Sequence, residues 1–417
     1  MSDVKKTLER RSARVSAKSS KCKPADKSAK KTVLEMERMV SDAGLKRKQG
    51  GIDVNDSKKL IISVEGKISI AEEGQYVRLV PDSEITRAKI NTFVNITETW
   101  NKLSQWLSPR QYEVVQGQPC IQPFMHLETL GWTGQVFHST VMRLTNHSAM
   151  GDALWFQIGE DLGRFSINKF CLITGLNYIG STHLPVVDSQ LISRYFLTVR
   201  GVSRENLELQ MSNAKFDNDD DAVKLSLLYI MFSIPLSNAS AIKIDPKFFA
   251  LVDDLDAFDV FPWGVLSWEA TRAAICHTVD NRMSSKKRPL KKIYKVHYSL
   301  PGFPHALLVW AYETLPSIAS KFTTKYEQAI PHMMSWTIVK NVKFDDVVAA
   351  FTTVGESQLK GFVLMPTEEE LKNPWVARLF FKNPTAMPQL PPRKSSVPQP
   401  STDTNSEWRE FQTEIRG

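Results

Sequence analysis

The stretch "LSLLYIMFSIP", residues 225–235, constrains the fold more than any other part of the sequence. Its apolar side chains would surround a helix axis on every side, and such a helix must be buried in a protein core or a membrane. The run is too short for a bilayer, which takes about 20 apolar residues. Asp219–Asp221 supply negative charge at the expected helix start, and Pro235 ends the helix. The sequence therefore predicts a central helix around which a helical domain packs.

Three further helices are predicted from capping residues and apolar spacing. Residues 83–109 begin at Ser83 and carry an apolar stripe through Ile90, Phe93, Val94, Trp100, Leu103 and Leu107. A second helix is expected to begin at the cap Ser267, with Glu269 in its first turn. A third starts with Pro304 in its first turn and ends at Pro316.

The β component is expected to be small. Residues 152–160, "DALWFQIGE", combine aromatic and β-branched residues with flanking turn residues, which indicates a strand. Residues 58–73 alternate apolar and polar side chains and predict a hairpin, and a short helix is expected over 32–43. The predicted fold class is mainly α with a minor β component (α+β): a single helical globular domain with short hairpins and disordered tails.

The stretch "RFSINKFCLITGL", Arg164–Leu176, predicts a helix capped by Ser166 and closed by Gly175 in the left-handed conformation. Cys171 then stands near the helix end, where it is expected to touch Leu176 in a Schellman-type arrangement. A thiol in such an apolar setting has a raised pKa and is inert. Cys171 is therefore interpreted as a core residue.

Charge divides the chain. The net charge is +8, and residues 1–50 hold 15 Lys/Arg against 6 Asp/Glu, which leaves 38 against 39 in the rest. We expect a basic disordered tail at 1–50 with a short helix, a hairpin and linker at 51–82, the helical domain at 83–383, and a Pro-rich disordered tail at 384–417. The folded part lacks the broad positive surface typical of nucleic-acid binding.

The sequence carries no signature of catalysis, metal binding or a cofactor. The four cysteines, Cys22, Cys120, Cys171 and Cys276, form no C-x-x-C pair, and neither H-E-x-x-H nor a phosphate-binding glycine loop occurs. The acidic clusters 217–221 and 253–259 are interpreted as helix-start and surface charge rather than as a two-metal site. We therefore expect no catalytic, cofactor-binding or metal-binding residue, no enzyme activity, and no membrane association for a soluble, intracellular protein.

Two short motifs suggest partners. "KKRPLKK" is expected to serve as a nuclear import signal or a phosphate-contacting patch through Lys286, Lys287, Arg288, Lys291 and Lys292, and the alternative interpretation is a solvated loop. "PQLPPR", residues 388–393, fits the P-x-x-P-x-R pattern of polyproline ligands, although most such stretches are linkers. The expected localisation is the nucleus, otherwise the cytoplasm.

Four stretches carry a family resemblance: "FMHLETLGWTGQVFHSTVMRL", "ALWFQIGEDLGRFSINKFCLITGLN", "PWGVLSW" and "GFPHALLVWAYETLP". Together they resemble the plant family called domain of unknown function nineteen-eighty-five, over about residues 124–268 and less clearly to 316. The resemblance implies a Mutator-like, transposon-derived protein, and many members carry a Ulp-type SUMO protease domain after this domain. That protease needs a cysteine downstream of its histidine, whereas the last cysteine here, Cys276, falls within the resembling region, so we expect the protease domain to be absent from this sequence.

The resemblance transfers structural positions only, because the family has no established catalytic residues. Lys169 stands where an acidic residue is usual. The matching structural positions are Phe137, Arg143, Trp155, Phe156, Arg164, Phe165, Ser166, Phe170, Thr174, Gly175, Leu176, Trp263, Gly264, Gly302, Phe303, Pro304, Trp310, Tyr312 and Glu313. His138, Leu144, Asn177 and Ala311 match as well.

Three hypotheses on function follow. The first is a non-catalytic interaction domain that binds an unknown protein partner. The second is a nuclear protein that binds nucleic acid without sequence specificity through its basic tail and residues 286–292. The third is the remnant of a multidomain Ulp-type cysteine protease that lacks its catalytic domain.

Overall fold

The computed structural model describes residues 77–376 apart from gaps at 126, 128–129, 147–151, 160, 198–199, 214–215, 286–295, 327–328, 339–341, 353–363, 365 and 374–375. The chain divides into two units, Met1–Ile61 and Ile62–Gly417, and every described residue lies in the second. The expected helix at 32–43, the hairpin at 58–73, both tails, and Lys286–Lys292 lie outside the described residues. No helix among the described residues is long and apolar enough to span a membrane.

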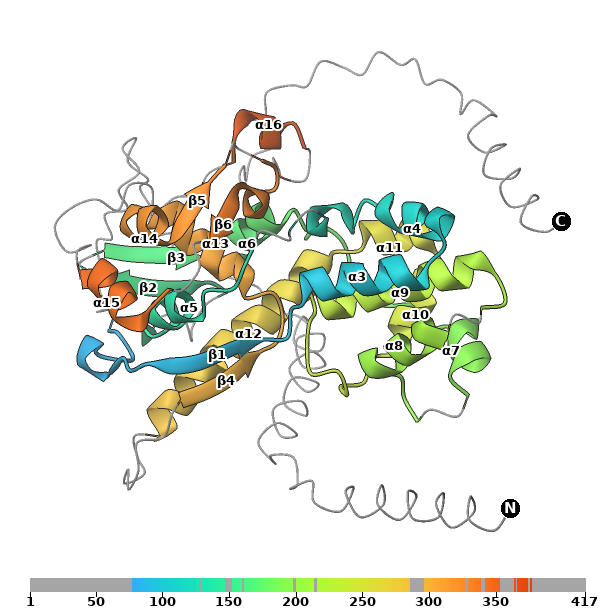
Figure 1. The fold of residues 1–417 in the computed structure, drawn as a ribbon, viewed down its shortest axis with the longest axis horizontal. Coiled ribbons are helices and arrows are strands. Elements are labelled where there is room, and N and C mark those ends of the chain that lie inside the picture. Colours follow the sequence, from blue (N-terminus) through green and yellow to red (C-terminus); the bar gives the residue numbers. More distant parts are fainter. Residues whose placement is uncertain are drawn as a thin grey trace, which may run out of the picture. The chain divides into compact units, whose positions relative to one another are not determined.

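The first half of the described chain (Figure 1) runs through η1 (Asp82–Glu84), β1 (Ala88–Thr92), α3 (Ile96–Trp106), α4 (Pro109–Gln116), η2 (Gln122–Phe124), α5 (Gly134–Val141), β2 (Leu154–Ile158), β3 (Asp161–Phe165), α6 (Ile167–Thr174), α7 (Gln190–Tyr195) and α8 (Arg204–Asn213). The second half contains α9 (Asp219–Ser233), α10 (Lys247–Val252), α11 (Leu255–Val260), α12 (Trp263–Ser285), β4 (Val296–Leu300), α13 (His305–Thr314), α14 (Pro316–Phe322), β5 (Thr323–Lys325), η4 (His332–Ser335), β6 (Trp336–Ile338), α15 (Phe344–Thr352) and α16 (Glu368–Leu371). The predicted fold class, mainly α with a minor β component, is confirmed.

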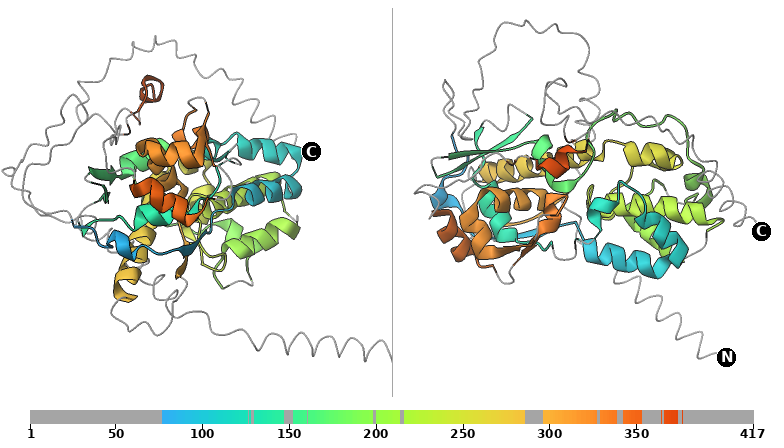
Figure 2. Two further views of the ribbon diagram at one scale, coloured as in Figure 1. Left: turned by 60° about the vertical axis from the view of Figure 1, so that its left-hand side comes forward. Right: turned by 90° about the horizontal axis from the view of Figure 1, so that it is seen from above.

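Helix α9 is the buried central helix that its sequence predicts. Its residues from Leu225 to Met231 are all buried, and α3, α4, α8 and α10 pack against it, as Figures 1 and 2 show. Asn218 caps the helix, because its side chain accepts a hydrogen bond from the Asp221 N–H at 2.8 Å. The acidic first turn faces the positive end of the helix dipole.

Helix α6 also forms as predicted, with a difference at each end. Gly175 closes it in the left-handed conformation (φ 73°), and its N–H donates to the Cys171 carbonyl at 2.8 Å. A helix end with this single backbone bond is the simpler αL motif. A Schellman motif would need a second bond, from the Leu176 N–H to a helix carbonyl, but this N–H donates to the Thr174 hydroxyl. The predicted Schellman-type end was therefore wrong. Ser166 stands at the N-cap position, but its side chain caps nothing.

The first part of the helix predicted over 83–109 is wrong, because Ala88–Thr92 is the strand β1. It pairs in parallel with β4, so that Ile90 lies opposite Tyr298. Ala88 and Ile90 are buried while Lys89 and Asn91 are exposed, which is the two-residue alternation of a strand. A pairing partner about 200 residues away overrode the local helical spacing. The helix itself, α3, begins only at Ile96.

Helix α12 begins earlier than predicted. It starts at Trp263, directly after Pro262, so Ser267 is an interior residue and not a cap. The Ser267 hydroxyl donates to the Pro235 carbonyl at 2.6 Å, which ties α12 to the segment that follows α9. Pro304 is the N-cap of α13, and Pro316 opens α14 immediately after α13 ends at Thr314.

The β structure consists of three two-stranded pairs in the described residues. The predicted strand at 152–160 is confirmed as β2, which pairs with β3 in an antiparallel hairpin. β5 and β6 pair in the same way, and only β1 and β4 are parallel. Helix α12 packs against both α6 and β4, so one long helix links the hairpin region to the parallel pair.

Candidate functional site

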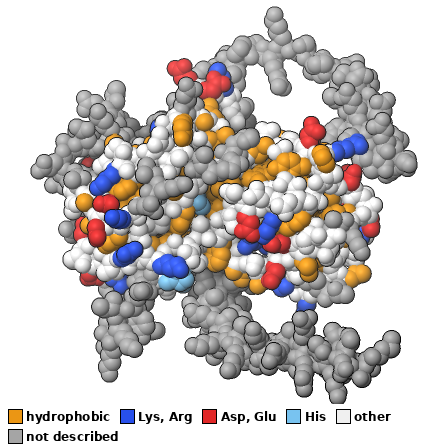
Figure 3. All heavy atoms as spheres, viewed as in Figure 1, with side chains coloured by type: hydrophobic (Ala, Val, Ile, Leu, Met, Phe, Trp, Pro, Cys, Tyr) orange, Lys and Arg blue, Asp and Glu red, His pale blue; other side chains and the backbone are white. Residues whose placement is uncertain are grey.

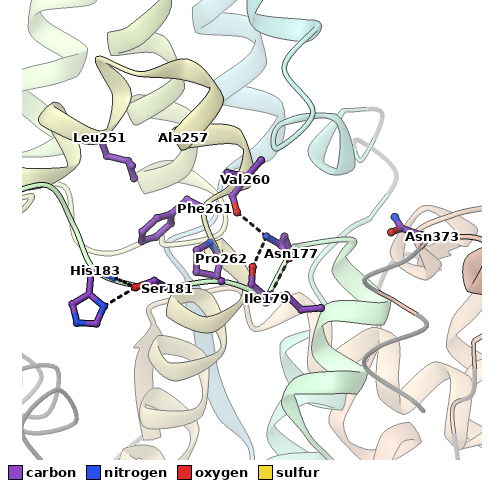
Figure 4. Close-up of a pocket in the computed structure, with 11 residues that line it drawn as sticks. Asn177, Ile179, Ser181, His183, Leu251, Ala257, Val260, Phe261, Pro262 and Asn373 are labelled. Carbon is purple, nitrogen blue, oxygen red and sulfur yellow. Dashed lines mark hydrogen bonds between the residues drawn. The ribbon is translucent and has the colours of Figure 1, made fainter. Parts of the chain in front are cut away.

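The first candidate site is an apolar hollow where the loop after α6 meets the corner between α11 and α12 (Figure 4). We call it the Asn177 hollow. Its volume is about 620 Å³. It is lined by Asn177, Ile179, Gly180, Ser181, His183, Leu251, Ala257, Val260, Phe261, Pro262 and Asn373. Apolar side chains dominate the lining, and among the described residues His183 is its single ionisable group.

Asn177 holds the two walls of this hollow together. Its side-chain amide donates to the Val260 carbonyl at 2.8 Å and to the Ile179 carbonyl at 3.0 Å, as Figure 4 shows. Its side-chain oxygen accepts from the Ile179 N–H at 2.9 Å, and its backbone carbonyl accepts from the Gly264 N–H at 2.7 Å. Both amide hydrogens are therefore committed to the protein itself, which makes Asn177 a structural residue.

Gly264 allows α12 to approach the end of α6 without a side chain between them. A Cβ atom at this position would lie 2.7 Å from Cys171 Sγ and 2.8 Å from the Asn177 carbonyl oxygen. Real Cβ atoms essentially never approach so closely, so glycine is required there. The motifs "TGLN" and "PWG" thus meet in one contact, between Asn177 and Gly264, and Asn177 also lines the hollow.

Ser181 and His183 form a serine–histidine pair at the rim that the sequence analysis missed. Ser181 Oγ lies 2.6 Å from His183 Nδ1. Such a pair can activate a hydroxyl for nucleophilic attack. Here, however, the same Ser181 Oγ also accepts the His183 backbone N–H at 3.1 Å, the pattern of a local serine turn. The S-x-H spacing was its only signal in the sequence.

A second hollow, which we call the Glu370 hollow, lies beside the first and shares Asn373 with it. Its volume is about 640 Å³. It is lined by Gln116, Pro119, Gln122, Pro123, Met125, Leu172, Gly175, Ile330, Pro331, Met334, Glu369, Glu370, Asn373 and Val376. Prolines, methionines and aliphatic side chains form most of the lining, and its only charged residues in the described part of the chain are Glu369 and Glu370. Figure 3, which has the same viewing direction as Figure 1, shows hydrophobic side chains at the surface over α4 and α11.

A charge cluster adjoins the Glu370 hollow and consists of Glu313, His332, Trp336 and Glu370, which are largely buried, and the exposed Lys325. Glu313 accepts hydrogen bonds from Lys325 Nζ (2.9 Å), His332 Nδ1 (3.0 Å) and Trp336 Nε1 (2.9 Å). His332 Nε2 lies 3.2 Å from a Glu370 carboxylate oxygen. Every charge in this cluster therefore faces an opposite charge, and the cluster joins α13, β5, η4 and α16.

Opposing effects set the pKa values in this cluster. Burial favours the neutral forms, but the hydrogen bonds outweigh it for Glu313, His332 and Glu370. They raise the pKa of His332 to about 9 and lower the pKa of Glu313 to about 2. At neutral pH His332 is thus a cation held between two carboxylates. Its role is to hold α16 against the domain, since Glu370 belongs to α16.

The remaining candidate chemical groups lie in the core. Cys171 is fully buried, and burial raises its pKa well above the ordinary range. His138 and His305 are buried, and burial lowers their pKa values to about 4 and about 3. His138 contacts the Tyr298 hydroxyl at 2.8 Å and the Thr86 carbonyl at 2.9 Å. In the part of the chain that the structure describes, no group of three or more His, Cys, Asp and Glu is arranged to hold a metal ion.

The acidic clusters of the sequence are used locally. Asp221 pairs with Arg194 and accepts from the Tyr195 hydroxyl at 2.7 Å. Asp254 caps α11 by accepting from the Ala257 N–H at 3.0 Å, and Asp259 accepts from the Cys120 N–H at 3.3 Å. These carboxylates do not converge on one point.

The aromatic residues of the family motifs come together in the core. Phe165 lies 5.7 Å from Trp310 and 5.3 Å from Trp268 between ring centroids, and Phe156 lies 5.3 Å from Trp310. The fully or almost fully buried motif residues are Phe137, Leu144, Phe156, Phe165, Ser166, Phe170, Thr174, Leu176, Trp263, Phe303, Trp310, Ala311 and Tyr312. Three separate stretches of sequence thus build one aromatic core.

Other motif residues make specific contacts. Arg143 is buried, donates to the Ser139 carbonyl at 2.7 Å and to Asp82 at 2.9 Å, and lies 4.0 Å above the Phe351 ring centroid. Arg164 lies over Trp155 at 5.8 Å, on the half-buried face of the hairpin. Gly302 has φ 77° and packs against Thr271, whose hydroxyl accepts the Phe303 N–H at 2.8 Å. Trp155, Arg164, Cys171 and Glu313 do not gather around either hollow.

Comparison with known proteins gives one match. Residues 145–274 match the family model described as "Domain of unknown function (DUF1985)". The match runs from the residues before the β2–β3 hairpin to the middle of α12, and it confirms the resemblance predicted from the sequence. No curated protein and no solved structure matches the chain.

Proposed function

Given that residues 145–274 match the DUF1985 family model, we propose that this chain is a non-catalytic interaction protein that binds an apolar, uncharged segment of a partner protein in the Asn177 hollow. The observation that supports this proposal is the mainly apolar lining of the hollow. The polar groups of Asn177 are bonded to Ile179 and Val260, whereas the Val260 side chain is exposed and those of Ile179 and Ala257 are half-buried.

Val260 illustrates this character. It closes α11 with its side chain 68% exposed, while its carbonyl is occupied by the Asn177 amide. Burying exposed apolar surface of this kind releases about 25 cal/mol per Å². With His183 as the only ionisable lining residue, the hollow offers nothing to balance a charge on a bound segment. A partner segment with uncharged apolar side chains therefore fits it best.

A catalytic role has weaker support. The Ser181 hydroxyl oxygen already accepts a hydrogen bond from the His183 backbone N–H. The nearby Asn177 side-chain amide donates both of its hydrogens to carbonyl groups. An acyl-transfer site needs donors that remain available for the developing oxyanion. The hollow therefore suits binding better than acyl transfer.

The test uses the full chain with a photoactivatable crosslinking residue at Ile179 and two surface variants. Val260→Asp places a charge in the hollow, and Leu209→Asp places one on α8 at a residue of similar exposure, 61%. We expect the unsubstituted chain and Leu209→Asp to crosslink a specific partner from cell extract. Val260→Asp should give at least tenfold less of the crosslinked product. Equal crosslinking by both variants would refute the proposal.

A catalytic alternative is checked with the same proteins. Ester and peptide hydrolysis is measured for the full chain and for Ser181→Ala. Turnover that Ser181→Ala abolishes would overturn the non-catalytic assignment, whereas we expect no turnover that depends on this hydroxyl.

We also propose nuclear import through Lys286–Lys292, supported by the density of basic residues in the sequence alone. A fluorescent fusion in which these lysines and Arg288 are replaced by Gln should lose nuclear accumulation. If the same region contacts nucleic acid, affinity should fall steeply with salt. The transposon and protease-remnant origins implied by the family resemblance stay predictions.

A further inference from the structure

The Glu370 hollow carries an inference separate from the proposed function. Its lining is mainly apolar and includes two acidic residues, Glu369 and Glu370. Residues 368–372, "EEELK", hold three carboxylates against Lys372. Glu370 is occupied by His332, and Glu369 pairs with Lys372 in an exposed contact. Exposed pairs of this type contribute at most about 1 kcal/mol, so Glu369 remains able to exchange Lys372 for another cation.

Two further polar residues of the lining also suit an extended chain. The side-chain amides of Gln116 and Gln122 make no hydrogen bond to any described residue, and both line the hollow. An amide offers donors and an acceptor that a peptide backbone can use. Met125 and Met334 flank the prolines of the lining, and methionine side chains adapt readily to apolar ligands.

The chain itself contains a segment with the complementary character. Residues 388–394, "PQLPPRK", place Pro388, Leu390, Pro391 and Pro392 before Arg393 and Lys394. Proline-rich segments lose little conformational entropy on binding because their backbone is already restricted. Their two positive charges can pair with Glu368 and Glu369, the two carboxylates of residues 368–372 that His332 does not engage.

The connection is short enough to bring the two together. Val376 lines the hollow, and eleven residues, 377–387, separate it from Pro388. An extended chain spans about 3.3–3.6 Å per residue, so this linker reaches any part of the hollow. A tether of this length gives an effective concentration on the order of 1 mM.

We infer that residues 388–394 of this chain bind in its own Glu370 hollow, with the prolines and Leu390 against the apolar lining and Arg393 and Lys394 toward Glu368 and Glu369. In this arrangement the segment competes with any basic, proline-containing partner for the same surface.

The test compares full-length chains that differ in the segment. The probe is a fluorescein-labelled synthetic peptide of residues 384–396, and the measurement is fluorescence anisotropy. In the unsubstituted chain the tethered segment competes with the probe, whereas in R393E/K394E it does not. We expect the probe to bind R393E/K394E about tenfold more tightly, as a ~1 mM effective concentration and a ~0.1 mM peptide Kd predict.

Two variants then locate the binding surface. Adding E368K/E369K to the R393E/K394E chain should weaken the probe at least tenfold, and a probe with Glu at both basic positions should recover affinity for that chain. Adding Leu209→Asp instead should change nothing. Equal measurable probe affinity for the unsubstituted and R393E/K394E chains, or indifference to E368K/E369K, would each overturn the inference.

A measurement without the peptide keeps the inference testable if affinity is low. Amide hydrogen exchange near Met125 and Met334 should be faster in R393E/K394E than in the unsubstituted chain. The difference should not depend on protein concentration. A difference that grows with concentration would assign the contact to a second copy and contradict binding within one chain.

Discussion

The Gly264 contact and the Glu313–His332–Glu370 charge cluster lie on either side of α6 and its C-terminal loop, yet they are built on opposite principles. At Gly264 the chain omits a side chain, so that α12 can touch Cys171 and Asn177. In the charge cluster the chain buries several long side chains and satisfies each with hydrogen bonds.

The two regions also differ in their relation to the family match. Gly264, Cys171 and Asn177 all fall within residues 145–274, whereas every member of the charge cluster lies beyond them. A contact defined by shape tolerates almost no added volume but is insensitive to pH. A cluster defined by charge depends on the protonation of its members. Stability measurements should therefore separate the two.

The largest effect is expected for Glu313→Gln. The substitution leaves His332 and Lys325 without their shared carboxylate, and breaking a buried ion pair on one side costs about 4 kcal/mol. Urea unfolding at pH 7 measures the loss. The control Glu369→Gln removes an exposed carboxylate paired with Lys372 and should cost less than about 1 kcal/mol. A similar cost for both substitutions would mean that the cluster is not a tightly coupled unit.

Gly264→Ala should follow, with a loss of about 3 kcal/mol, because the new methyl group meets a backbone oxygen that cannot move away alone. Gly117→Ala is the matched control, since its Cβ would have no neighbour closer than 3.5 Å. That variant should be neutral or slightly more stable in urea unfolding. If Gly264→Ala were as stable as Gly117→Ala, the close contact between α12 and α6 would be disproved.

The pH dependence should reveal two opposing groups. His332 has a folded-state pKa raised to about 9 from 6.5, so its contribution is complete below pH 6.5 and is lost as the pH rises through about 9. Lys169, on α6, has a folded-state pKa lowered to about 7 from 10.5 by burial and by the charge of Arg164. The folded state then releases a proton that the unfolded state keeps, so stability rises above pH 7.

Between pH 7 and 9 these two contributions should nearly cancel in the unsubstituted protein. His332→Gln should become more stable with rising pH and Lys169→Met less stable, each by about 2 kcal/mol over this range relative to its own value at pH 7. Urea unfolding at half-unit pH intervals gives both slopes. Parallel curves for the two variants would show that neither group titrates as its surroundings imply.

The smallest effect is expected for Ser166→Ala. Ser166 occupies the N-cap position of α6, but its hydroxyl is buried without a hydrogen-bond partner among the described residues. Its removal should therefore change stability by less than about 0.5 kcal/mol or increase it. Asn218→Ala, which removes a working cap from α9, should cost about 1 kcal/mol. Equal costs would show that Ser166 does cap α6 in solution.

Local patterns predicted the elements that depend on neighbouring residues. The all-round apolar surface of α9, the left-handed Gly175 and the hairpin strand at 154–158 each follow from residues within a few positions. The same reasoning failed where a distant segment decides. Ser267 resembles a cap but lies inside α12, because the corner at Pro262 lets the helix begin four residues earlier.

The candidate site shows the same division. The sequence drew attention to Gly175, Asn177 and Gly264 as motif positions, but it did not indicate that they meet beside two hollows. Glu313 was identified only as a matching position, because its partner His332 lies 19 residues further along, and Glu370, the second carboxylate that pairs with His332, lies 57 residues further along. No periodicity connects groups at such separations.

The sequence by itself determined a helical protein with a dry aromatic core, since apolar spacing and capping residues act over single turns of the chain. Only the tertiary structure decided that β1 pairs with β4, that α12 packs closely on the end of α6 because Gly264 has no side chain, and that His332 lies between two carboxylates. These features depend on distances between segments far apart in the chain, and such distances are fixed only when the whole core packs.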